Sequence, residues 1–354
     1  MTSAWVGRLL VGLVLLAACG LPATAQDSTW RVEGKLLGEA EGAGFEKSED
    51  VSGIACDSAP ALPRLCLLVD DETQGAQIVL LKEGELLAGD FIPLTKAQHG
   101  GKPLELDAEA VAFDNGAFYV AGSHGRARHE SNSAKEAKND AKAAATRQIF
   151  RITLPASAVD MTTGRLIGPP GITPSTALAD ILRGQPELSQ AYDKALEDNG
   201  LTIEGLAVRD QRLYLGMRGP VIGSDAAVLS VAVSAVFDGQ PAQPRLYKLA
   251  LGTDTAGRPR GIRDLAATGA GFLVLAGPVN DPEDDTAIRP GDYAIYLWDG
   301  ENPPDRRLDL NTYGRKAKPE ALLPLDGDAG RVRVLLMFDG PKEGAPRALD
   351  VSLR

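Results

Sequence analysis

The side chains best suited to chemistry in this sequence gather in residues 106–126, LDAEAVAFDNGAFYVAGSHGR. Two carboxylates, Asp107 and Glu109, stand near the start of this stretch, and His124 and Arg126 stand at its end. Carboxylates and an imidazole can exchange protons or hold a metal ion, and a guanidinium binds anions. These groups can form one site only if the chain folds back between them.

The pattern between the two ends indicates such a fold-back. An apolar run is interrupted by Asn115-Gly116, a dipeptide typical of two-residue hairpin turns. The same phrase, an acidic or small residue followed by two apolar runs around a turn, recurs from Gly53, Glu204, Asp264 and Glu320. In the copy that begins at Gly53, glycine takes the acidic position. The chain therefore contains five related hairpins.

The copies are evenly spaced except between 109 and 204, where two insertions lengthen the chain. Residues 127–146 are polar and rich in lysine and alanine, which favours a mobile or loosely helical segment. Residues 173–200 predict two short helices, with Pro174 and Pro186 in first turns and Gly184 at a helix end. Without these insertions the interval shrinks to about one repeat.

Further strand-like runs follow each hairpin, so the repeating unit contains about four strands. Turn-rich repeats of this kind are typical of an all-β β-propeller with four-stranded antiparallel blades. We expect one domain over 27–354 with five blades, six being the alternative. The last unit is one strand short, and the run at 30–37 could supply it and close the ring, which would remove exposed sheet edges.

In a blade, the start of the innermost strand and the end of the second lie on the same face. We therefore expect one mixed acidic and arginine site there, with Glu109 and His124 as candidate catalytic residues. The candidate ligand-binding residues are Asp70, Asp71, Glu72, Asp107, Arg126, Arg218, Arg263, Asp264 and Lys318. Converging carboxylates without cysteine pairs suit a hard cation, Ca²⁺ before Mg²⁺, with Asp71, Glu109, Glu204 and Glu320 as candidate ligands.

A purely structural interpretation of the same residues stays open. Each carboxylate would then accept hydrogen bonds from the next blade, or pair with an arginine, and hold the ring together. His124 would likewise only hydrogen-bond a neighbouring blade. Ser123 does not indicate a serine hydrolase, because a polar insertion follows it instead of the helix that a nucleophile elbow needs.

The N-terminal residues predict export. A short apolar run precedes Ala23-Thr24-Ala25, which indicates a signal peptide over 1–25 with cleavage before Gln26. The alternative is a lipoprotein signal ending before Cys19, whose side chain would carry the lipid anchor. The apolar run is too short to span a bilayer. Either route predicts a periplasmic or secreted protein, in the second case anchored through Cys19.

Charge and cysteine content limit the partners and the compartment. The net charge of −11 argues against nucleic acid and anionic lipid as partners. Cys56 and Cys66 end one apolar run and begin the next, so a hairpin would place them side by side. In an oxidising compartment such a pair predicts a disulfide, the alternative being two buried thiols.

At these phrases the chain resembles a largely bacterial family known as domain of unknown function 3616. The resemblance rests on SGIA with LLVDDE, EAVAFDNGAFYVAGSHGR, IEGLAVRDQRLYLGMRGP, GIRDLA with LVLAGP, and PEALL. That family implies no activity. A more distant similarity, to the propeller domain called esterase-like activity of phytase, implies phosphoester hydrolysis with a divalent cation.

Two functions are therefore open. The first is an exported propeller that binds a small anionic molecule or a protein of the cell envelope, which the lack of an unambiguous nucleophile favours. The second is a metal-assisted phosphoester or ester hydrolase, which the clustering of His124 with arginines favours. Whether the chain is an enzyme stays undecided by the sequence.

Overall fold

Each copy of the repeat folds as the inner hairpin of one sheet. In the copy that contains Glu109, β11 (Ala108–Asp114) pairs antiparallel with β12 (Ala117–Gly122). Asn115 and Gly116 in the turn both have positive φ, which a two-residue hairpin of this kind requires and which asparagine and glycine tolerate. The turn dipeptide therefore sets the register of this hairpin.

The structure is a computed structural model that describes residue 1 and residues 27–354, except for 43, 60, 127–132, 282–287 and 315. The predicted signal peptide and its alternative, a lipid anchor at Cys19, lie outside the described residues. So does the first part of the predicted 127–146 insertion.

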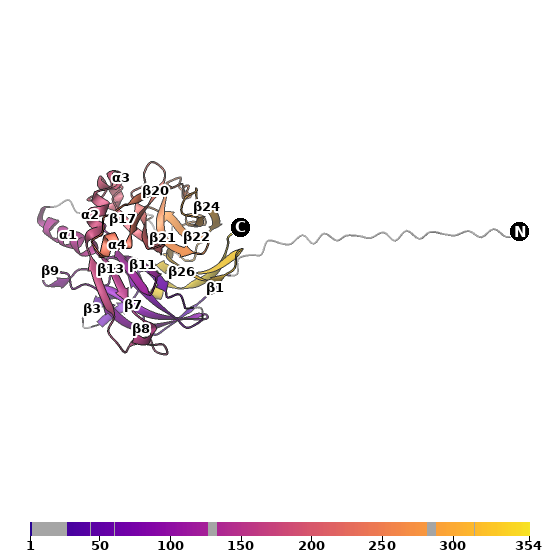
Figure 1. Cartoon of the computed structure of the whole chain (residues 1–354), viewed down its shortest axis with the longest axis horizontal. Helices are drawn as coiled ribbons and strands as arrows, with labels where there is room; N and C mark the ends of the chain where they lie inside the picture. Colours follow the sequence, from indigo (N-terminus) through magenta and orange to yellow (C-terminus); the bar gives the residue numbers. More distant parts are fainter. Residues whose placement is uncertain (2–26, 43, 60, 127–132, 282–287, 315) are drawn as a thin grey trace.

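Five sheets follow one another round a ring in sequence order, as the colours in Figure 1 show, and this confirms the five-bladed propeller. From the axis outwards, the first blade contains β5 (Val51–Cys56), β6 (Arg64–Asp70), β7 (Gly75–Lys82) and β8 (Glu85–Pro93). The second contains β11, β12, β13 (Ile149–Thr153) and β16 (Gly171–Ser175). The third contains β17 (Thr202–Arg209), β18 (Arg212–Gly219), β19 (Ala226–Ala232) and β20 (Arg245–Leu249). The fourth contains β21 (Arg260–Thr268), β22 (Gly271–Pro278), β23 (Ala294–Trp298) and β24 (Asp305–Asp309).

The N-terminal segment closes the ring, as predicted. The fifth blade consists of β25 (Lys318–Gly327), β26 (Arg331–Asp339), β27 (Arg347–Ser352) and, at its outer edge, β1 (Ser28–Thr29). The closing strand lies just before the expected run at 30–37. Part of that run, β2 (Arg31–Glu33), instead pairs in parallel with β8 of the first blade. The N-terminal segment thus joins the last blade to the first.

The apolar core is divided into five clusters, and each lies between two adjacent blades. Trp30, Leu68 and Met337, for example, belong to the cluster between the first and fifth blades. Alternating apolar residues on both faces of every sheet make this possible, because each blade packs against a neighbour on either side. Burial between blades therefore stabilises the ring as a whole.

Every innermost strand carries a β-bulge at the same place. The pairing register skips one residue between Val51 and Gly53, Ala108 and Ala110, Ile203 and Gly205, Ile262 and Asp264, and Pro319 and Ala321. The skipped residues are Ser52, Glu109, Glu204, Arg263 and Glu320. The repeat alignment from sequence was therefore one residue out in two copies, where Gly53 and Asp264 had been matched to Glu109.

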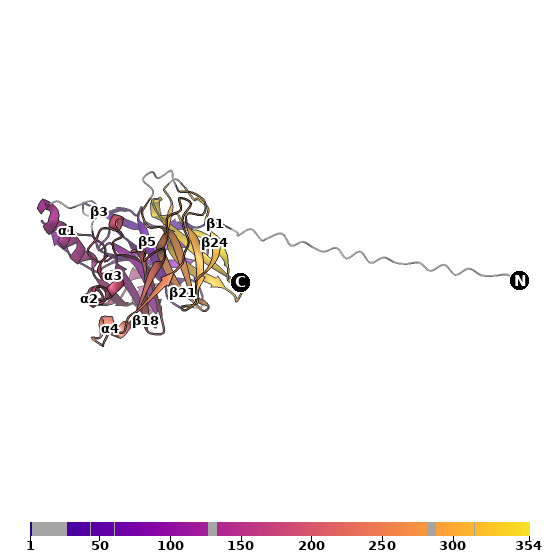
Figure 2. The same ribbon diagram turned by 90° about the horizontal axis from the view of Figure 1, so that it is seen from above.

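Helices occur in both predicted insertions. They are α1 (Ser133–Thr146), α2 (Ala177–Arg183) and α3 (Pro186–Ser189), with α4 (Val233–Phe237) in the third blade. Figures 1 and 2 show α1, α2 and α3 on one side of the ring. Pro174 was expected in a helix but lies in β16, the outer strand of the second blade, where a residue without an N–H is tolerated.

The remaining described elements are short hairpins and 3₁₀ turns outside the five blades. The small hairpins pair β3 (Leu37–Glu41) with β4 (Gly44–Lys47), β9 (Gln98–His99) with β10 (Lys102–Pro103), and β14 (Val159–Asp160) with β15 (Arg165–Leu166). The 3₁₀ turns are Ala156–Ala158, Leu196–Asp198 and Lys342–Gly344. Among the described residues, no helix combines the length and the apolar character that crossing a bilayer requires.

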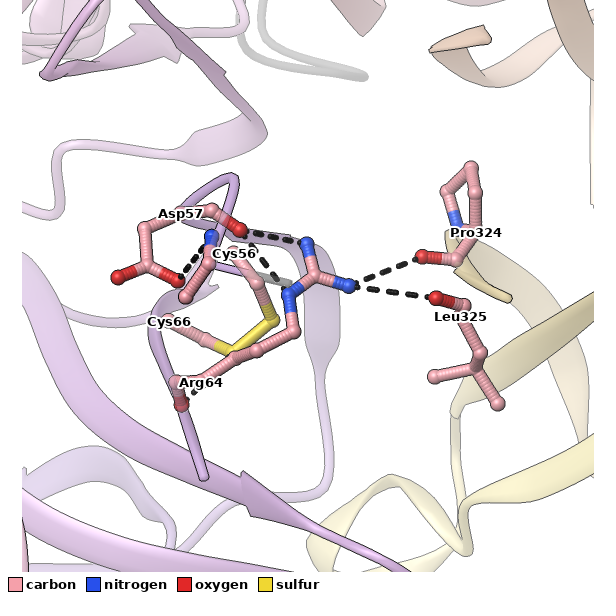
Figure 3. Close-up of a disulfide and its surroundings, with 7 residues drawn as sticks. Cys56, Asp57, Arg64, Cys66, Pro324 and Leu325 are labelled. Carbon is pink, nitrogen blue, oxygen red and sulfur yellow. Dashed lines mark hydrogen bonds between the residues drawn. A yellow bond between two sulfur atoms is a disulfide. The ribbon is translucent and has the colours of Figure 1, made fainter. Parts of the chain in front are cut away.

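The predicted disulfide between Cys56 and Cys66 is present and joins β5 to β6, where the two residues are directly paired. Figure 3 shows Arg64 beside it, reaching from the first blade to the fifth. Its guanidinium donates to the carbonyl of Asp57 at 2.7 and 3.0 Å, and to those of Pro324 and Leu325 at 3.5 Å. The disulfide lies at the end of β5, away from the strand starts that the predicted site occupies.

Candidate functional site

A cavity of about 330 Å³ lies at the end of the propeller axis where the innermost strands begin. We call it the axial cavity. The carboxylates that line it are Asp50, Asp71, Glu105, Asp107, Glu109, Glu204, Asp281, Glu320 and Asp339. The cations that line it are Arg126, Lys142, Arg218 and Lys318. Acidic groups outnumber basic ones, and the two kinds are unevenly distributed.

Cations and carboxylates neutralise each other on the side formed by the third, fourth and fifth blades. Arg218 Nη1 lies 2.8 Å from Glu204 Oε1, and its Nη2 lies 2.6 Å from Asp281 Oδ1. Its Nε donates to the carbonyl of Val279 at 2.5 Å. Attraction to Glu204 and Asp281 outweighs burial and raises the pKa of Arg218. Three donor nitrogens of Arg218 are thus bound within the protein.

Arg263, the bulge residue of the fourth blade, is fully buried behind this wall. Its Nε lies 3.1 Å from Glu204 Oε2, and its Nη2 contacts Glu320 Oε1. These contacts are ion pairs by distance, although their alignment falls short of hydrogen bonds. One arginine therefore neutralises the bulge residues of both neighbouring blades.

Lys318 completes this paired side. Its Nζ contacts Asp339 and lies 3.6 Å from Asp281 Oδ2. Asp339 also faces Asp50 across an isolated β-bridge, so two carboxyl groups lie close together here. Burial raises the pKa of Asp50, and the nearby charge of Asp339 adds to this effect. Such a pair favours one shared proton.

The side formed by the first and second blades is different. Asp71, Asp107 and Glu109 each place a carboxylate oxygen within 4.8 Å of the others. Burial raises the pKa of Asp71 and of Glu109, and the charges of neighbouring carboxylates raise both further. Ser123 donates its hydroxyl hydrogen to Asp107, which fixes one of the three. We call these three residues the acidic cluster.

The insertion helix α1 supplies part of the cavity rim. Lys142 lies 3.8 Å from Glu105, and Arg126 lies 3.2 Å from Asp140. Both acidic partners are largely exposed, so these pairs are screened by water and weak. The rim cations are therefore more available to a ligand than Arg218 and Arg263.

Most residues of the predicted site meet in the axial cavity. The lining includes Asp71, Asp107, Glu109, Arg126, Glu204, Arg218, Lys318 and Glu320, with Arg263 directly behind. Asp70 does not line the cavity: it is buried and accepts hydrogen bonds from Ser48 Oγ at 2.6 Å and the Glu72 N–H at 3.1 Å. Burial raises the pKa of Asp70 to about 7. Glu72 is exposed and also lies outside the lining.

Asp264 lies elsewhere, because the bulge turns it away from the axial cavity. It is buried and accepts hydrogen bonds from the backbone N–H groups of Leu265 at 2.7 Å and Leu322 at 2.6 Å. Leu322 belongs to the next blade, so Asp264 ties the fourth blade to the fifth. This is the structural role that the sequence left open for the carboxylates.

His124 also lies outside the cavity lining, although Ser123 and Gly125 on either side belong to it. Its side chain is fully buried, its φ is 56°, and neither ring nitrogen has a hydrogen-bond partner. Burial, and then the charges of Arg147 and Arg183, lower the pKa of His124 to about 3. The imidazole is therefore neutral at physiological pH.

Sequence reasoning missed several lining residues, among them the charged residues Asp50, Glu105, Lys142 and Asp281. Asp50 directly precedes β5 and Asp281 follows β22, so both stand at blade positions that the same-face rule covers. The repeat could have identified these two. Glu105 and Lys142 lie in a connecting segment and in an insertion, and no repeat signal points to them.

Comparisons with known proteins add a family but no activity. A family model described as "Protein of unknown function (DUF3616)" matches residues 170–349. No curated protein matches the chain.

Several solved structures resemble the chain weakly. An exo-β-1,3-galactanase from Clostridium thermocellum has 10% identity and a TM-score of 0.45, with 93% of this chain and 63% of that chain covered. The chain thus spans less than two thirds of the galactanase. A GH43 endo-arabinanase from Bacillus licheniformis has 8% identity and a TM-score of 0.35, with 87% and 96% covered. At these values neither similarity carries an inference about activity.

Proposed function

Since the chain belongs to the DUF3616 family, a family of unknown function, we propose its function from the axial cavity: it is an exported propeller that binds a small anionic ligand there. The observation that carries this proposal is the contrast between the cations of the cavity. Arg218 and Arg263 are bound by buried carboxylates, whereas Arg126 and Lys142 pair with exposed ones. The rim cations can therefore exchange Asp140 and Glu105 for the anionic group of a ligand.

Export is supported by the disulfide and by the predicted signal peptide. Disulfides persist mainly in oxidising compartments such as the periplasm or the extracellular space. Both cysteines of the Cys56–Cys66 bond are buried, which fits a structural bond. Whether the mature chain is free or anchored through Cys19 is a question for mass spectrometry of the native N-terminus.

The test is equilibrium binding of small anions to the purified chain. Inorganic phosphate and succinate serve as probes in titration calorimetry at low ionic strength. Arg126→Gln and Lys142→Gln should each weaken binding about tenfold to a hundredfold, because a hydrogen bond to a charged group contributes about 1.5–3 kcal/mol. Lys138→Gln, an exposed residue of the same helix outside the cavity, is the matched control. Saturable binding that none of the variants changes would contradict the proposed site.

A metal-assisted phosphoester or ester hydrolase is the second candidate function. It is favoured by the carboxyl pair of Asp50 and Asp339, which can hold a proton beside the ligand. His124 is a poor candidate for this role because it is buried outside the lining. Turnover of phospho- and carboxyl esters that a chelator and Asp50→Asn both abolish would establish the enzyme. Anion binding without turnover would leave the binding function.

A further inference from the structure

Among the described residues, Glu109 is the one acidic bulge residue that forms no direct ion pair, although Arg218 and Arg263 act on it at longer range. Glu204 and Glu320 both pair with Arg263, whereas Glu109 has no hydrogen bond or ion pair with any residue that the structure describes. Its side chain lines the axial cavity, yet the residue is only 8% exposed. A carboxyl group that is nine-tenths buried and forms no ion pair is neutralised either by a proton or by a cation bound from outside the chain, and its place in the cavity lining gives a cation access to it.

Asp71 is a second carboxylate of the cavity lining with a buried oxygen that lacks a hydrogen-bond partner among the described residues. Its Oδ1 is fully buried and accepts no hydrogen bond within the described part of the chain. It comes from the end of β6 in the first blade, whereas Glu109 comes from β11 in the second. Asp107 stands between them, and Ser123 holds its carboxylate. Three oxygens from two blades thus converge on one point of the cavity wall.

We propose that Asp71, Asp107 and Glu109 bind a divalent cation, most readily Ca²⁺. The inference rests on the proposed function, in which the axial cavity is the ligand site, and it names what the acidic side of that site holds. Carboxylate oxygens are the ligands that hard cations prefer, and Ca²⁺ accepts irregular sets of six to eight oxygens. Neither cysteine nor histidine is among the described lining residues, which disfavours zinc.

The cation has a consequence for the anionic ligand. Three carboxylates leave coordination positions for water or for a ligand oxygen, because they supply fewer oxygens than Ca²⁺ takes. A phosphate or carboxylate can then contact the cation on one side and Arg126 and Lys142 on the other. The cation also cancels negative charge that would repel the anion from the cavity.

The experiment measures cation binding without any organic ligand. The full-length chain is treated with EDTA, dialysed, and titrated with CaCl₂ and separately with MgCl₂ by calorimetry. We expect saturable binding of one cation, tighter for Ca²⁺, and a higher Tm with Ca²⁺. Asp71→Asn and Glu109→Gln should each weaken Ca²⁺ binding at least tenfold. Neither should lower the Tm of the metal-free chain, because each removes a buried charge and keeps the size of the side chain.

Asp210→Asn is the matched control. Asp210 is an exposed carboxylate in the β17–β18 turn, outside the cavity lining, and its positive φ suits asparagine. The Asp210→Asn variant should bind Ca²⁺ with the same affinity as the unmodified chain. Absence of saturable binding of either cation, or equal loss in the control, would overturn the inference. If phosphate still binds in EDTA while no cation binds, the proposed function stands and this inference falls. If Ca²⁺ binds but no anion does, this inference stands and the proposed function falls.

Discussion

Arg263 of the fourth blade lies 3.1 Å from Glu204 of the third blade and also contacts Glu320 of the fifth. All three occupy the bulge position of their innermost strands, and all three are buried. The ring is thus held on this side by one positive charge between two negative ones. Glu109, the bulge residue of the second blade, forms no direct ion pair with Arg263, whose charge acts on it only at longer range.

Removing this arginine should be costly. Arg263→Met leaves Glu320 buried without its counter-charge and Glu204 with Arg218 alone, which is expected to lower the free energy of unfolding by about 3–5 kcal/mol. Urea unfolding at neutral pH measures the loss. Arg306→Gln, which breaks an exposed pair with Asp309 in β24, should cost at most about 1 kcal/mol. Similar losses in the two variants would show that Arg263 has no special structural role.

A glycine at the junction of the third and fourth blades should resist substitution. A Cβ on Gly261 would stand 2.1 Å from the backbone oxygen of Arg218, so one of the two strands must move. Gly261→Ala is therefore expected to lower the free energy of unfolding by roughly 1–3 kcal/mol or more. Gly269→Ala in a hairpin turn, where a Cβ meets nothing within 4 Å, is the control for thermal melts. An unchanged Tm for Gly261→Ala would contradict the close approach.

The disulfide should contribute measurably to stability. It closes a short loop, with a separation of 10 residues between Cys56 and Cys66, which predicts about 2–3 kcal/mol from loop entropy. The double variant Cys56→Ala/Cys66→Ala should therefore melt at a lower temperature, and a reductant should lower the Tm of the unmodified chain but not of the variant. Thiol titration of the denatured, unreduced chain that starts at Gln26, and so lacks Cys19, provides a direct check, and two reactive thiols would disprove the bond.

Buried His124 predicts a pH dependence with a defined sign. In the unfolded chain its pKa is about 6.5, but burial and then Arg147 and Arg183 lower the folded-state pKa to about 3. The unfolded chain therefore binds the extra proton, and stability is lost as pH falls from about 6.5 towards 3. Between pH 7 and pH 5 the loss from this group should be about 2 kcal/mol.

His124→Asn isolates that contribution, because asparagine tolerates the positive φ and does not titrate. The difference in unfolding free energy between the unmodified chain and this variant should shrink by that amount from pH 7 to pH 5. Urea unfolding at several pH values measures it, with exposed His99→Asn as the control. Parallel pH curves for the chain and His124→Asn would refute the prediction.

Most of the fold could be predicted because its signals are local. Asn115-Gly116 and its counterparts mark hairpin turns, and the apolar runs around them repeat. β16 was missed because Pro174 and the neighbouring glycine weaken the strand pattern, and only its place at the outer edge makes it acceptable. The closing strand was expected at 30–37 but is β1, which lies just before it. A strand of two residues is too short to show an alternating apolar pattern in the sequence.

The sequence could predict on which face of the propeller the site lies, but not which side chains point into it. Strand direction brings Asp71, Glu109 and Glu204 to one cavity, but a bulge shifts side chains by one residue. Such a shift moves a side chain from one face of the strand to the other. Arg263 therefore takes the axial position that had been assigned to Asp264, and His124 turns away while Ser123 faces the cavity. The pairing of charges across blades depends on tertiary distances that no spacing in the sequence reveals.

The pairing of β1 with β27 constrains the order in which the propeller can fold. Of the strands described, β1 is synthesised before all others and β27 after them, yet they hydrogen-bond to each other. The fifth blade cannot be completed before β27 is synthesised, and contacts of such long sequence separation form slowly. Until then the edge of the last blade stays available for pairing with other chains. Removal of β1 or of β27 would leave the same sheet edge unpaired, so these two strands, far apart in the sequence, behave as one unit of cooperativity.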